Sequence, residues 1–289
     1  MTFGGRKHHL SICVILLILG NIFLFRLEWK SSQKLLTFVM LDVGQGDALF
    51  IESPTGTQII FDAGPPRKIL SALSWVISPF DKNIDAIVIT NPDADHIGGF
   101  AEILKNYKVG YVFEPGTIND SKTFQNLKSE IKKKKIPDIL ARKGMRLHLG
   151  GGAVIDILFP DRDVREWATN EGSVVARLSY GSTSVLLTGD STSKTEKIIL
   201  EENSSLLLKS DVLKVGHHGS RSSTSLPFVK LIAPQYALVS AGADNSYGHP
   251  HPETSKTLLN LGVKVLRTDL VGTIIMKSDG QKETFSFRR

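Results

Sequence analysis

The sequence predicts an α/β fold in which two β-sheets pack face to face and helices cover their outer sides. Short runs of β-branched and apolar residues, bounded by turn-forming residues, are more numerous than one flat sheet accommodates. Helical patterns lie between these runs, so hairpins and crossover connections are mixed. Several runs also finish in short polar clusters, which is typical of layered α/β proteins whose ligand sites collect at one end of the strands.

Composition excludes several kinds of protein. The 289 residues are 41% hydrophobic and 22% charged, which suits a globular protein with a core. The formal charge of +6 includes a net +3 from four basic residues and one acidic residue in the first 30 positions, so the rest of the chain is too weakly basic to argue nucleic-acid binding by itself. The single cysteine, Cys13, excludes a disulfide framework and a cysteine-rich metal site. Any metal must therefore be held by His, Asp and Glu.

The N-terminal part of the chain differs from the rest. The basic stretch RKHH precedes an apolar run at 10–25 without a formal charge. A helix over this run covers about 24 Å, so Leu27 and snorkelling flanks must help it to cross a core of about 30 Å. We expect residues 1–9 in the cytoplasm, a single-pass signal anchor at 10–27, a linker at 28–36 and a domain at 37–289 outside the membrane. A cleaved signal peptide, giving a secreted protein, is the alternative, although only Ser31 and Ser32 offer small residues after the run.

The strand candidates are apolar or β-branched runs that end near Gly, Pro, Asp or Asn. In chain order they lie at 38–43, 47–53, 57–63, 85–90, 109–115, 153–160, 173–180, 183–189, 211–216, 236–241, 263–268 and 272–277. The helix candidates lie at 68–77, 98–107, 121–134, 192–201, 225–231 and 252–261. The lysine run at 132–135 closes the third helix, where cations suit the carbonyl end of the dipole. We favour a solvated helix end over a phosphate-binding patch there.

Five short clusters carry side chains that can bind a metal, and most of them lie at the end of a strand candidate. They are IIFDAG with Asp62, IVITNPDADH with Asn91, Asp93, Asp95 and His96, VLLTGD with Asp190, LKVGHHGS with His217 and His218, and SYGHPHPE with His249 and His251. Such a mixture of carboxylate and imidazole holds Zn²⁺, Mn²⁺ or Fe, and the high share of carboxylates moves the preference toward Mn²⁺. Two such ions about 3.5 to 4 Å apart would activate water and stabilise a displacement at phosphorus.

Each cluster also has a structural alternative. Asp190 can belong to a turn or cap the helix that follows it. A lone histidine after a buried strand is more often structural, although two adjacent ones before Gly-Ser are harder to explain so. We interpret His251 as a helix cap because Pro252 follows it, which leaves His249 as the better ligand. We expect Asp62 to orient a ligand by a hydrogen bond rather than to bind metal.

The set LDVGQGDA, FDAG, TNPDADHIGG, LLTGD, KVGHHGS and YGHPHPET resembles the metallo-β-lactamase superfamily, in particular the extracytoplasmic hydrolase domain of ComEC-type competence proteins. The likeness runs from Phe38 to the C-terminus, with six motifs in the correct order. It implies an αββα four-layer sandwich with a metal centre at the sheet edges. Relatives in this superfamily include nucleases, phosphodiesterases and a phosphorylcholine esterase.

The resemblance also implies roles for individual residues. The family's His-x-(His or Asp)-x-Asp-His motif falls on Asn91, Asp93, Asp95 and His96. Asp190 matches the bridging aspartate, and His249 is similar to the late ligand of the second metal. His217 and His218 match a motif whose histidines bind metal or protonate the leaving group, and which of them does which stays open. The implied catalytic residues are therefore Asp95, His217 and His218.

This chain departs from the family pattern in two places. Asn91 stands where the family commonly has histidine, and Asn170 lies near the expected middle ligand of the same site. Since an amide oxygen is a weak ligand for a transition metal, we expect one tight site for Zn²⁺ or Mn²⁺ and a second, weaker one. ComEC-type proteins carry a many-helix channel beside the hydrolase domain, whereas this chain has one apolar segment. We therefore expect a free-standing domain whose channel, if any, is a separate protein.

The sequence thus predicts a metal-dependent phosphodiesterase or nuclease that acts outside the cytoplasmic membrane. DNA during uptake is one candidate substrate, and other phosphodiesters, such as wall-polymer headgroups, are the alternative. A basic track through 132–135, Arg142, Lys143 or Arg221 would favour DNA. The alternative is a non-catalytic binding protein of a DNA-uptake assembly with a degraded metal centre. A true β-lactamase is disfavoured because the first-site histidines of those enzymes are missing.

Overall fold

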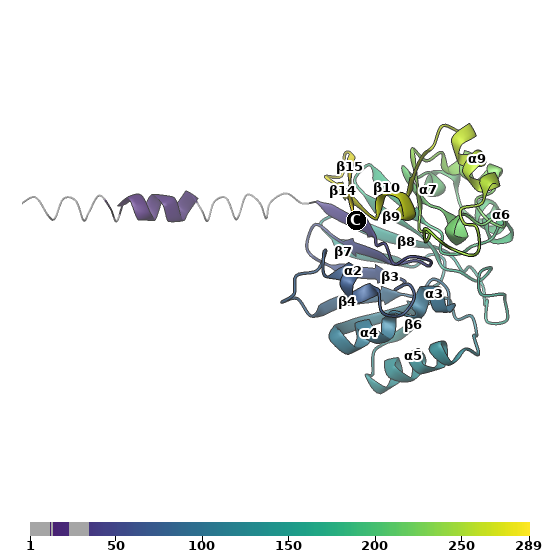
Figure 1. Cartoon of the computed structure of the whole chain (residues 1–289), viewed down its shortest axis with the longest axis horizontal. Helices are drawn as coiled ribbons and strands as arrows, with labels where there is room; N and C mark the ends of the chain where they lie inside the picture. Colours follow the sequence, from purple (N-terminus) through teal and green to yellow (C-terminus); the bar gives the residue numbers. More distant parts are fainter. Residues whose placement is uncertain (1–11, 13, 23–34) are drawn as a thin grey trace, which may run out of the picture. The chain divides into compact units, whose positions relative to one another are not determined.

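The computed structural model describes residues 12, 14–22 and 35–289 of the chain. It divides into two units, Met1–Lys34 and Leu35–Arg289, and the fold that follows is that of the second unit (Figure 1). The cytoplasmic segment expected at 1–9 lies outside the described residues, as do much of the anchor expected at 10–27 and most of the linker expected at 28–36. Within the described part of the chain, no helix is both long and apolar enough to cross a bilayer.

The first sheet has eight strands in the order β15-β14-β1-β2-β3-β4-β5-β6. These are β1 (Leu36–Met40), β2 (Leu49–Glu52), β3 (Gln58–Phe61), β4 (Asn83–Val88), β5 (Lys108–Glu114), β6 (Asp138–Leu140), β14 (Thr273–Ser278) and β15 (Glu283–Arg288). Pairing is antiparallel from β15 to β3 and parallel from β3 to β6. The sheet is therefore mixed, with its parallel half at the β6 edge.

The second sheet has seven strands in the order β13-β12-β11-β10-β9-β8-β7. These are β7 (Arg146–Gly150), β8 (Ala153–Phe159), β9 (Val175–Tyr180), β10 (Thr183–Leu187), β11 (Val212–Lys214), β12 (Tyr236–Val239) and β13 (Lys264–Arg267). Pairing is antiparallel from β7 to β10 and parallel from β10 to β13. Each sheet thus has a parallel half whose carboxyl ends can carry a site.

Helices cover the outer sides of both sheets. They are α2 (Ile69–Leu73), α3 (Ala94–Ile97), α4 (Phe100–Asn106), α5 (Lys122–Lys133), α6 (Ser193–Glu202), α7 (Ser205–Leu208), α8 (Leu226–Ile232), α9 (Pro252–Asn260) and α10 (Thr268–Val271), with a 3₁₀ turn, η1, at Gly216–Gly219. In Figure 1, α2, α4 and α5 lie on one side of the strands, and α6, α7 and α9 lie on the other.

Alternation along the strands explains the layers. In β1, Phe38 and Met40 point into the core between the two sheets, whereas Val39 packs in the layer under α2, α4 and α5. A third apolar layer joins the outer face of the second sheet to α6, α8 and α9 through residues such as Leu213 and Phe228. Three apolar layers between four layers of backbone make an αββα sandwich, so the predicted architecture is confirmed.

The predicted elements differ from the observed ones mainly at exposed edges. β6, β7 and β15 were not predicted, because β6 has only three residues and the other two carry exposed polar side chains that blur the apolar pattern. The first predicted helix, at 68–77, is shorter in the structure. His251 occupies the N-cap position of α9 as expected, but its imidazole accepts a hydrogen bond from the Arg221 backbone N–H (3.1 Å) instead of capping the helix.

Candidate metal centre

Loops that follow β3, β4, β10 and β11 bring residues from both sheets together at one end of the sandwich. The clearest link is the imidazole of His96, whose Nδ1 lies 2.8 Å from Asp62 Oδ2 and whose Nε2 lies 3.1 Å from Asp190 Oδ2. Asp62 follows β3, His96 lies in α3 just after β4, and Asp190 follows β10. The parallel halves of the two sheets therefore converge on one cluster of imidazoles and carboxylates.

Asp62 holds His96 in place rather than pointing into the cluster itself. Its Oδ1 accepts a hydrogen bond from the Thr90 backbone N–H at 2.8 Å, and its Oδ2 contacts His96 Nδ1. The residue adopts a positive φ of 57°, an uncommon conformation that aims its carboxylate back at β4. A carboxylate on one ring nitrogen fixes the orientation of the imidazole and leaves the other nitrogen free to bind a cation.

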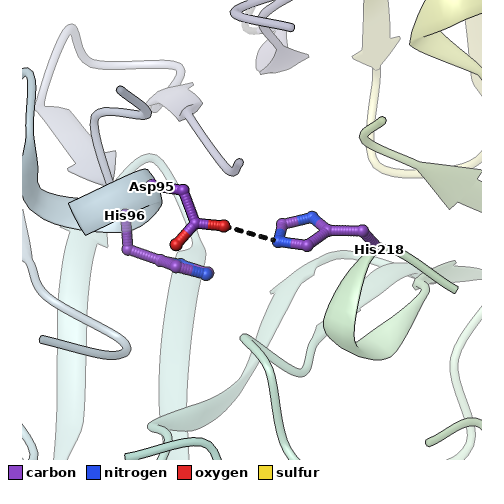
Figure 2. Close-up of side chains that lie close together, drawn as sticks. All are labelled: Asp95, His96 and His218. Carbon is purple, nitrogen blue, oxygen red and sulfur yellow. Dashed lines mark ion pairs between the residues drawn. The ribbon is translucent and has the colours of Figure 1, made fainter. Parts of the chain in front are cut away.

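Asp95 and His218 complete the cluster from opposite sides. Figure 2 shows Asp95 and His96 projecting from α3, with the His218 ring facing Asp95 across the gap. His218 Nε2 lies 3.4 Å from Asp95 Oδ2 and 3.5 Å from Asp190 Oδ2. On its other side, His218 Nδ1 lies 3.1 Å from the Ser240 carbonyl oxygen. The structure thus places Asp95, His96, Asp190 and His218 around one small volume.

Two residues of the cluster were not among the predicted site residues. Asp47, in the loop between β1 and β2, has Oδ1 3.4 Å from His218 Nδ1. The Lys214 ammonium is fully buried at the end of β11, where it contacts the Asp47 carboxylate, donates to the Gly189 carbonyl at 2.8 Å and lies 3.8 Å from Asp190 Oδ1. Both lie inside motifs that the sequence displays. A lysine within an apolar strand and an aspartate after Gly-Gln-Gly were the signals that could have found them.

The donor atoms of this cluster fit a divalent cation. Ligand atoms of Asp95, His96 and His218 lie within 4.8 Å of one another, and so do those of Asp47, Asp190 and His218. His96 Nε2, His218 Nε2 and Asp190 Oδ1 are buried and have no hydrogen-bond partner among the described residues. Buried polar atoms are rarely left unpaired, because each costs about 1–3 kcal/mol. Oxygen and nitrogen donors in this ratio suit Zn²⁺ or Mn²⁺.

Electrostatics in the metal-free protein favour positive charge at the same place. Burial opposes a charged His96, but Asp190 and Asp62 outweigh it and raise the His96 pKa well above its ordinary value. His218 is affected in the same way: burial is outweighed by Asp190 and Asp47, and its pKa rises to about 9. The Asp190 carboxyl is also buried, yet His96 and His218 hold its pKa well below the usual range. Protons on the two imidazoles therefore supply the positive charge that a bound cation would replace.

The residues expected at the first, weaker metal site are arranged differently. Asn91 Nδ2 donates to Asn170 Oδ1 at 2.6 Å, and Asn91 Oδ1 accepts from the Asp93 backbone N–H at 2.8 Å. The Asp93 carboxylate accepts from Thr169 Oγ1 at 2.9 Å and from Asn119 Nδ2 at 3.1 Å. These side chains therefore satisfy one another instead of presenting free donor atoms to an ion.

His217 lies between the two groups of residues. Its Nε2 is 3.8 Å from Asp190 Oδ2 and 3.5 Å from Asn170 Nδ2, and a quarter of its side chain (25%) is exposed. Burial, followed by the charge of His218 among other neighbours, lowers the His217 pKa although Asp190 opposes this. His217 and His218 both adopt left-handed backbone conformations, with φ of 48° and 53°. Strain of this kind, about 1–3 kcal/mol for each residue, is concentrated at functional sites.

His249 lies at the edge of the cluster, on a loop clamped to η1. Its ring centroid is 5.6 Å from that of His217 and 6.2 Å from that of His218, and burial together with these two histidines lowers its pKa to about 4. The clamp is close: a Cβ on Gly219 would lie 2.5 Å from Pro250 Cβ, and the His251 backbone N–H donates to the Gly219 carbonyl at 2.9 Å. His249 is therefore held beside the centre without belonging to the groups that lie within 4.8 Å.

The basic residues expected to form a track do not line the centre. Arg142 donates to the carbonyl oxygens of Pro115 and Ala141, both at 2.7 Å. Lys143 pairs with Glu202 at 3.5 Å, and Lys132 and Lys135 line a hollow at the end of α5. The Arg221 side chain is exposed in the turn after η1. None of these cations donates to a carboxylate of the cluster among the described residues.

Sequence comparisons match this arrangement to known proteins. Residues 41–243 match the model of the metallo-beta-lactamase superfamily. The chain is 34% identical over 274 residues to ComE operon protein 3 of Bacillus subtilis, covering 86% of this chain and 34% of that protein. It is 30% identical over 264 residues to Recombination protein 2 of Haemophilus influenzae, covering 90% of this chain and 31% of that protein. The chain thus spans about a third of the length of these relatives.

Two solved structures share the fold. One is a metallo hydrolase from the archaeon Ignicoccus hospitalis, with a TM-score of 0.55 and 18% identity over 83% of this chain and 98% of that one. The other is CmlA, a diiron β-hydroxylase from Streptomyces venezuelae, with a TM-score of 0.53 and 14% identity over 88% of this chain and 54% of that one. Since this fold carries both a hydrolase and a hydroxylase, the site must decide the chemistry.

Proposed function

The chain belongs to the metallo-β-lactamase superfamily, and from this premise we propose that it is a phosphodiesterase that works with one tightly bound divalent cation, Zn²⁺ or Mn²⁺. The observation that carries the proposal is the convergence of unpaired, buried donor atoms on His96, Asp190 and His218. Asp95 adds a fourth ligand from the same helix as His96. The absence of any cysteine from this cluster leaves only nitrogen and oxygen donors, which suit hydrolytic rather than thiolate chemistry.

The roles of the surrounding residues follow from their positions. A divalent cation bound here supplies Lewis-acid polarisation of a phosphoryl oxygen and lowers the pKa of water. Asp62 fixes the orientation of His96, and Lys214 offsets the negative charge of Asp47 and Asp190. His217 is more exposed than His218, and its lowered pKa leaves its imidazole neutral near pH 7. We therefore assign to it the acceptance of a proton from the attacking water and the delivery of that proton to the departing oxygen.

We favour a nucleic-acid strand as the substrate over other phosphodiesters. The support is the likeness to proteins named for competence and recombination, Competence protein ComA of Neisseria gonorrhoeae among them, which is 27% identical over 238 residues. A second candidate function, a non-catalytic binding protein of a DNA-uptake assembly, is favoured by one observation. Asn91 and Asn170 hydrogen-bond each other instead of facing an ion, as a degraded centre would require.

The test separates these two functions. The unit 35–289, which has its own core layers, is treated with a chelator and then reloaded with Mn²⁺ or Zn²⁺. We expect about one ion per chain and metal-dependent hydrolysis of both bis(p-nitrophenyl) phosphate and a single-stranded oligonucleotide. Retention of no metal, together with no hydrolysis, would contradict the phosphodiesterase and leave the binding protein. Hydrolysis of the small diester alone would point to a substrate other than nucleic acid.

We also propose that the domain works outside the cytoplasmic membrane. The support is the sequence pattern of a basic stretch followed by the apolar run at 10–25. Alkaline phosphatase, which folds only after export, is fused after residue 289 of the full chain and assayed in bacterial cells. Phosphatase activity is the expected result. A fusion that is abundant but inactive would place the domain in the cytoplasm.

A further inference from the structure

A basic hollow of about 400 Å³ lies beside the loops that build the metal centre. Its lining includes four cationic side chains, one aromatic ring and one carboxylate, namely Arg67, Lys68, Arg288, Arg289, Trp75 and Asp42. The hollow is formed by the segment before α2, by α2 itself and by the end of β15. It brings together cations that are far apart in the sequence, which is why no run of basic residues marked it.

Three cations of this hollow lack an anionic partner in the part of the chain that the structure describes. Among the described residues, Arg67, Lys68 and Arg288 form no ion pair, although each is exposed. The carboxylate of Asp42 is engaged by the Gly44 backbone N–H at 3.1 Å. The Arg288 guanidinium lies over the Trp75 ring, 3.4 Å from its centroid, and this cation–π contact limits its movement. Several unpaired cations in one concave place have the charge and the donor groups that a phosphate group requires.

Two chain segments connect the hollow to the metal centre. One runs from Asp42, in the hollow, to Asp47, in the centre; the other runs from Asp62, in the centre, to Arg67, in the hollow. Each has five residue steps, so each pair of Cα atoms is at most about 18 Å apart. The hollow is therefore within reach of an extended substrate of a few nucleotides that is bound at the centre.

Close backbone contacts hold both segments against α3, which carries Asp95 and His96. A Cβ on Gly46 would lie 2.1 Å from the Asp95 carbonyl oxygen, and one on Gly98 would lie 2.6 Å from Pro66 Cδ. The Asp47 backbone N–H also donates to the Asp95 carbonyl at 3.2 Å. Packing therefore fixes the distance between the hollow and the centre. A site that selects substrates by their length requires such a fixed distance.

We propose that this hollow binds a backbone phosphate of a single-stranded nucleic acid a few nucleotides from the bond that is cut. The inference rests on the proposed function and adds to it the class and minimum length of the substrate. Arg67, Lys68 and Arg288 hold the phosphate, and the half-exposed Trp75 ring (57%) offers a stacking surface to a neighbouring base. A polymer of glycerol phosphate would use the cations but not the ring.

The test compares Arg67→Ala/Arg288→Ala with the wild-type chain, loaded with Mn²⁺. Substrates are a labelled 12-nucleotide oligothymidylate and bis(p-nitrophenyl) phosphate, and binding is measured with a non-hydrolysable phosphorothioate strand at several KCl concentrations. We expect kcat/KM for the strand to fall about tenfold or more, while kcat/KM for the small diester stays within about twofold. Loss of the contact with this one phosphate lowers the slope of log Kd against log salt by about 0.7. Trp75→Leu is expected to weaken strand binding about tenfold.

The matched control is Lys132→Ala/Lys135→Ala, which removes the same charge from the end of α5. It is expected to leave the salt slope unchanged. Equal salt slopes for all three proteins would overturn the proposal, as would an equal fall in turnover of the small diester. A loss of affinity for a glycerol phosphate polymer as large as that for the strand would also overturn it. If the wild type cleaves neither substrate but the hollow variant alone binds the strand weakly, the hollow stands and the hydrolase fails.

Discussion

The two halves of the metal centre are both built from loops that follow strands, but only one half presents free donor atoms to an ion. In the half built from Asp95, His96, Asp190 and His218, donor atoms converge, and three of them, one each on His96, Asp190 and His218, are buried without a hydrogen-bond partner among the described residues. In the half built from Asn91, Asp93 and Asn170, every side chain pairs with a neighbour. The difference teaches that an amide at such a position does more than bind a metal weakly.

An amide changes the site because it carries a donor and an acceptor together. Asn91 uses both, donating to Asn170 and accepting from the Asp93 backbone, and so closes its half without an ion. Ionised carboxylates accept only, and a histidine already held at Nδ1 has one nitrogen left. The crowded half can therefore be neutralised only by protons, by the Lys214 ammonium or by a metal. We expect one tightly bound ion per chain for this reason.

The largest expected effect is on turnover and compares one aspartate from each half. Asp190→Asn removes a ligand that faces both His96 and His218, so we expect kcat/KM for bis(p-nitrophenyl) phosphate to fall by a factor on the order of 10³. Asp93→Asn alters a carboxylate held by Thr169 and Asn119, and we expect a change of less than about threefold. Circular dichroism checks that both variants fold. Equal losses in the two variants would break the comparison.

The next effect is on stability and concerns the buried cation. Lys214→Met leaves Asp47 and Asp190 without their compensating ammonium, and removal of one partner of a buried pair costs about 3–5 kcal/mol. Urea unfolding of the metal-free unit 35–289 measures the loss, with Lys194→Met as the control because Lys194 forms an exposed pair with Glu171. Added Mn²⁺ should restore part of the lost stability. A variant as stable as the control would show that the ammonium does not offset these carboxylates.

A smaller effect is on the pH dependence of the metal-free protein. The folded-state pKa of His218 is raised to about 9, so the stability that its proton contributes is fully present below about pH 6.5 and is lost as the pH rises through about 9. The pKa of His249 is lowered to about 4, so stability also falls as the pH drops from about 6.5 toward 4. We expect the free energy of unfolding to be greatest near pH 6.5. Metal-loaded protein should lose less stability above that pH, because the ion replaces the His218 proton.

The smallest expected effect is on metal content and concerns the half of the centre that contains the two amides. Asn91→His/Asn170→His replaces the hydrogen-bonded amides by imidazoles. We expect these rings not to hydrogen-bond each other, so that their nitrogens can face an ion near Asp93 and Asp190. We expect the metal content to rise from about one to about two ions per chain, the second released first by a weak chelator. Elemental analysis of the purified variant measures this. A content that stays at one would show that more than the amides keeps this half closed.

Much of the fold could be predicted because its strands alternate visibly, as Phe38, Val39 and Met40 do on the two faces of β1. The polar clusters after the strands also indicated where the chemistry gathers. Asp47 and Lys214 carry weaker sequence signals, an aspartate after Gly-Gln-Gly and a lysine within an apolar strand, and their contact depends on which strands lie side by side. The order of strands within each sheet, which places β11 next to β10, is a long-range property that no local pattern encodes. The different positions of His217 and His218 could not be predicted either, because they depend on the strained backbone of the turn that carries both residues.

The close approach of Gly219 to Pro250 has a consequence for anyone who wishes to exchange loops between members of this fold. There is no room for a side chain at Gly219, and the His251 backbone N–H donates a hydrogen bond to the Gly219 carbonyl. The turn η1 and the segment around His249 therefore pack tightly, and each depends on the shape of the other. A graft of either loop alone would bring in a mismatched partner and displace both sets of histidines. We therefore expect a loop exchange to transfer substrate specificity only when both segments are exchanged together.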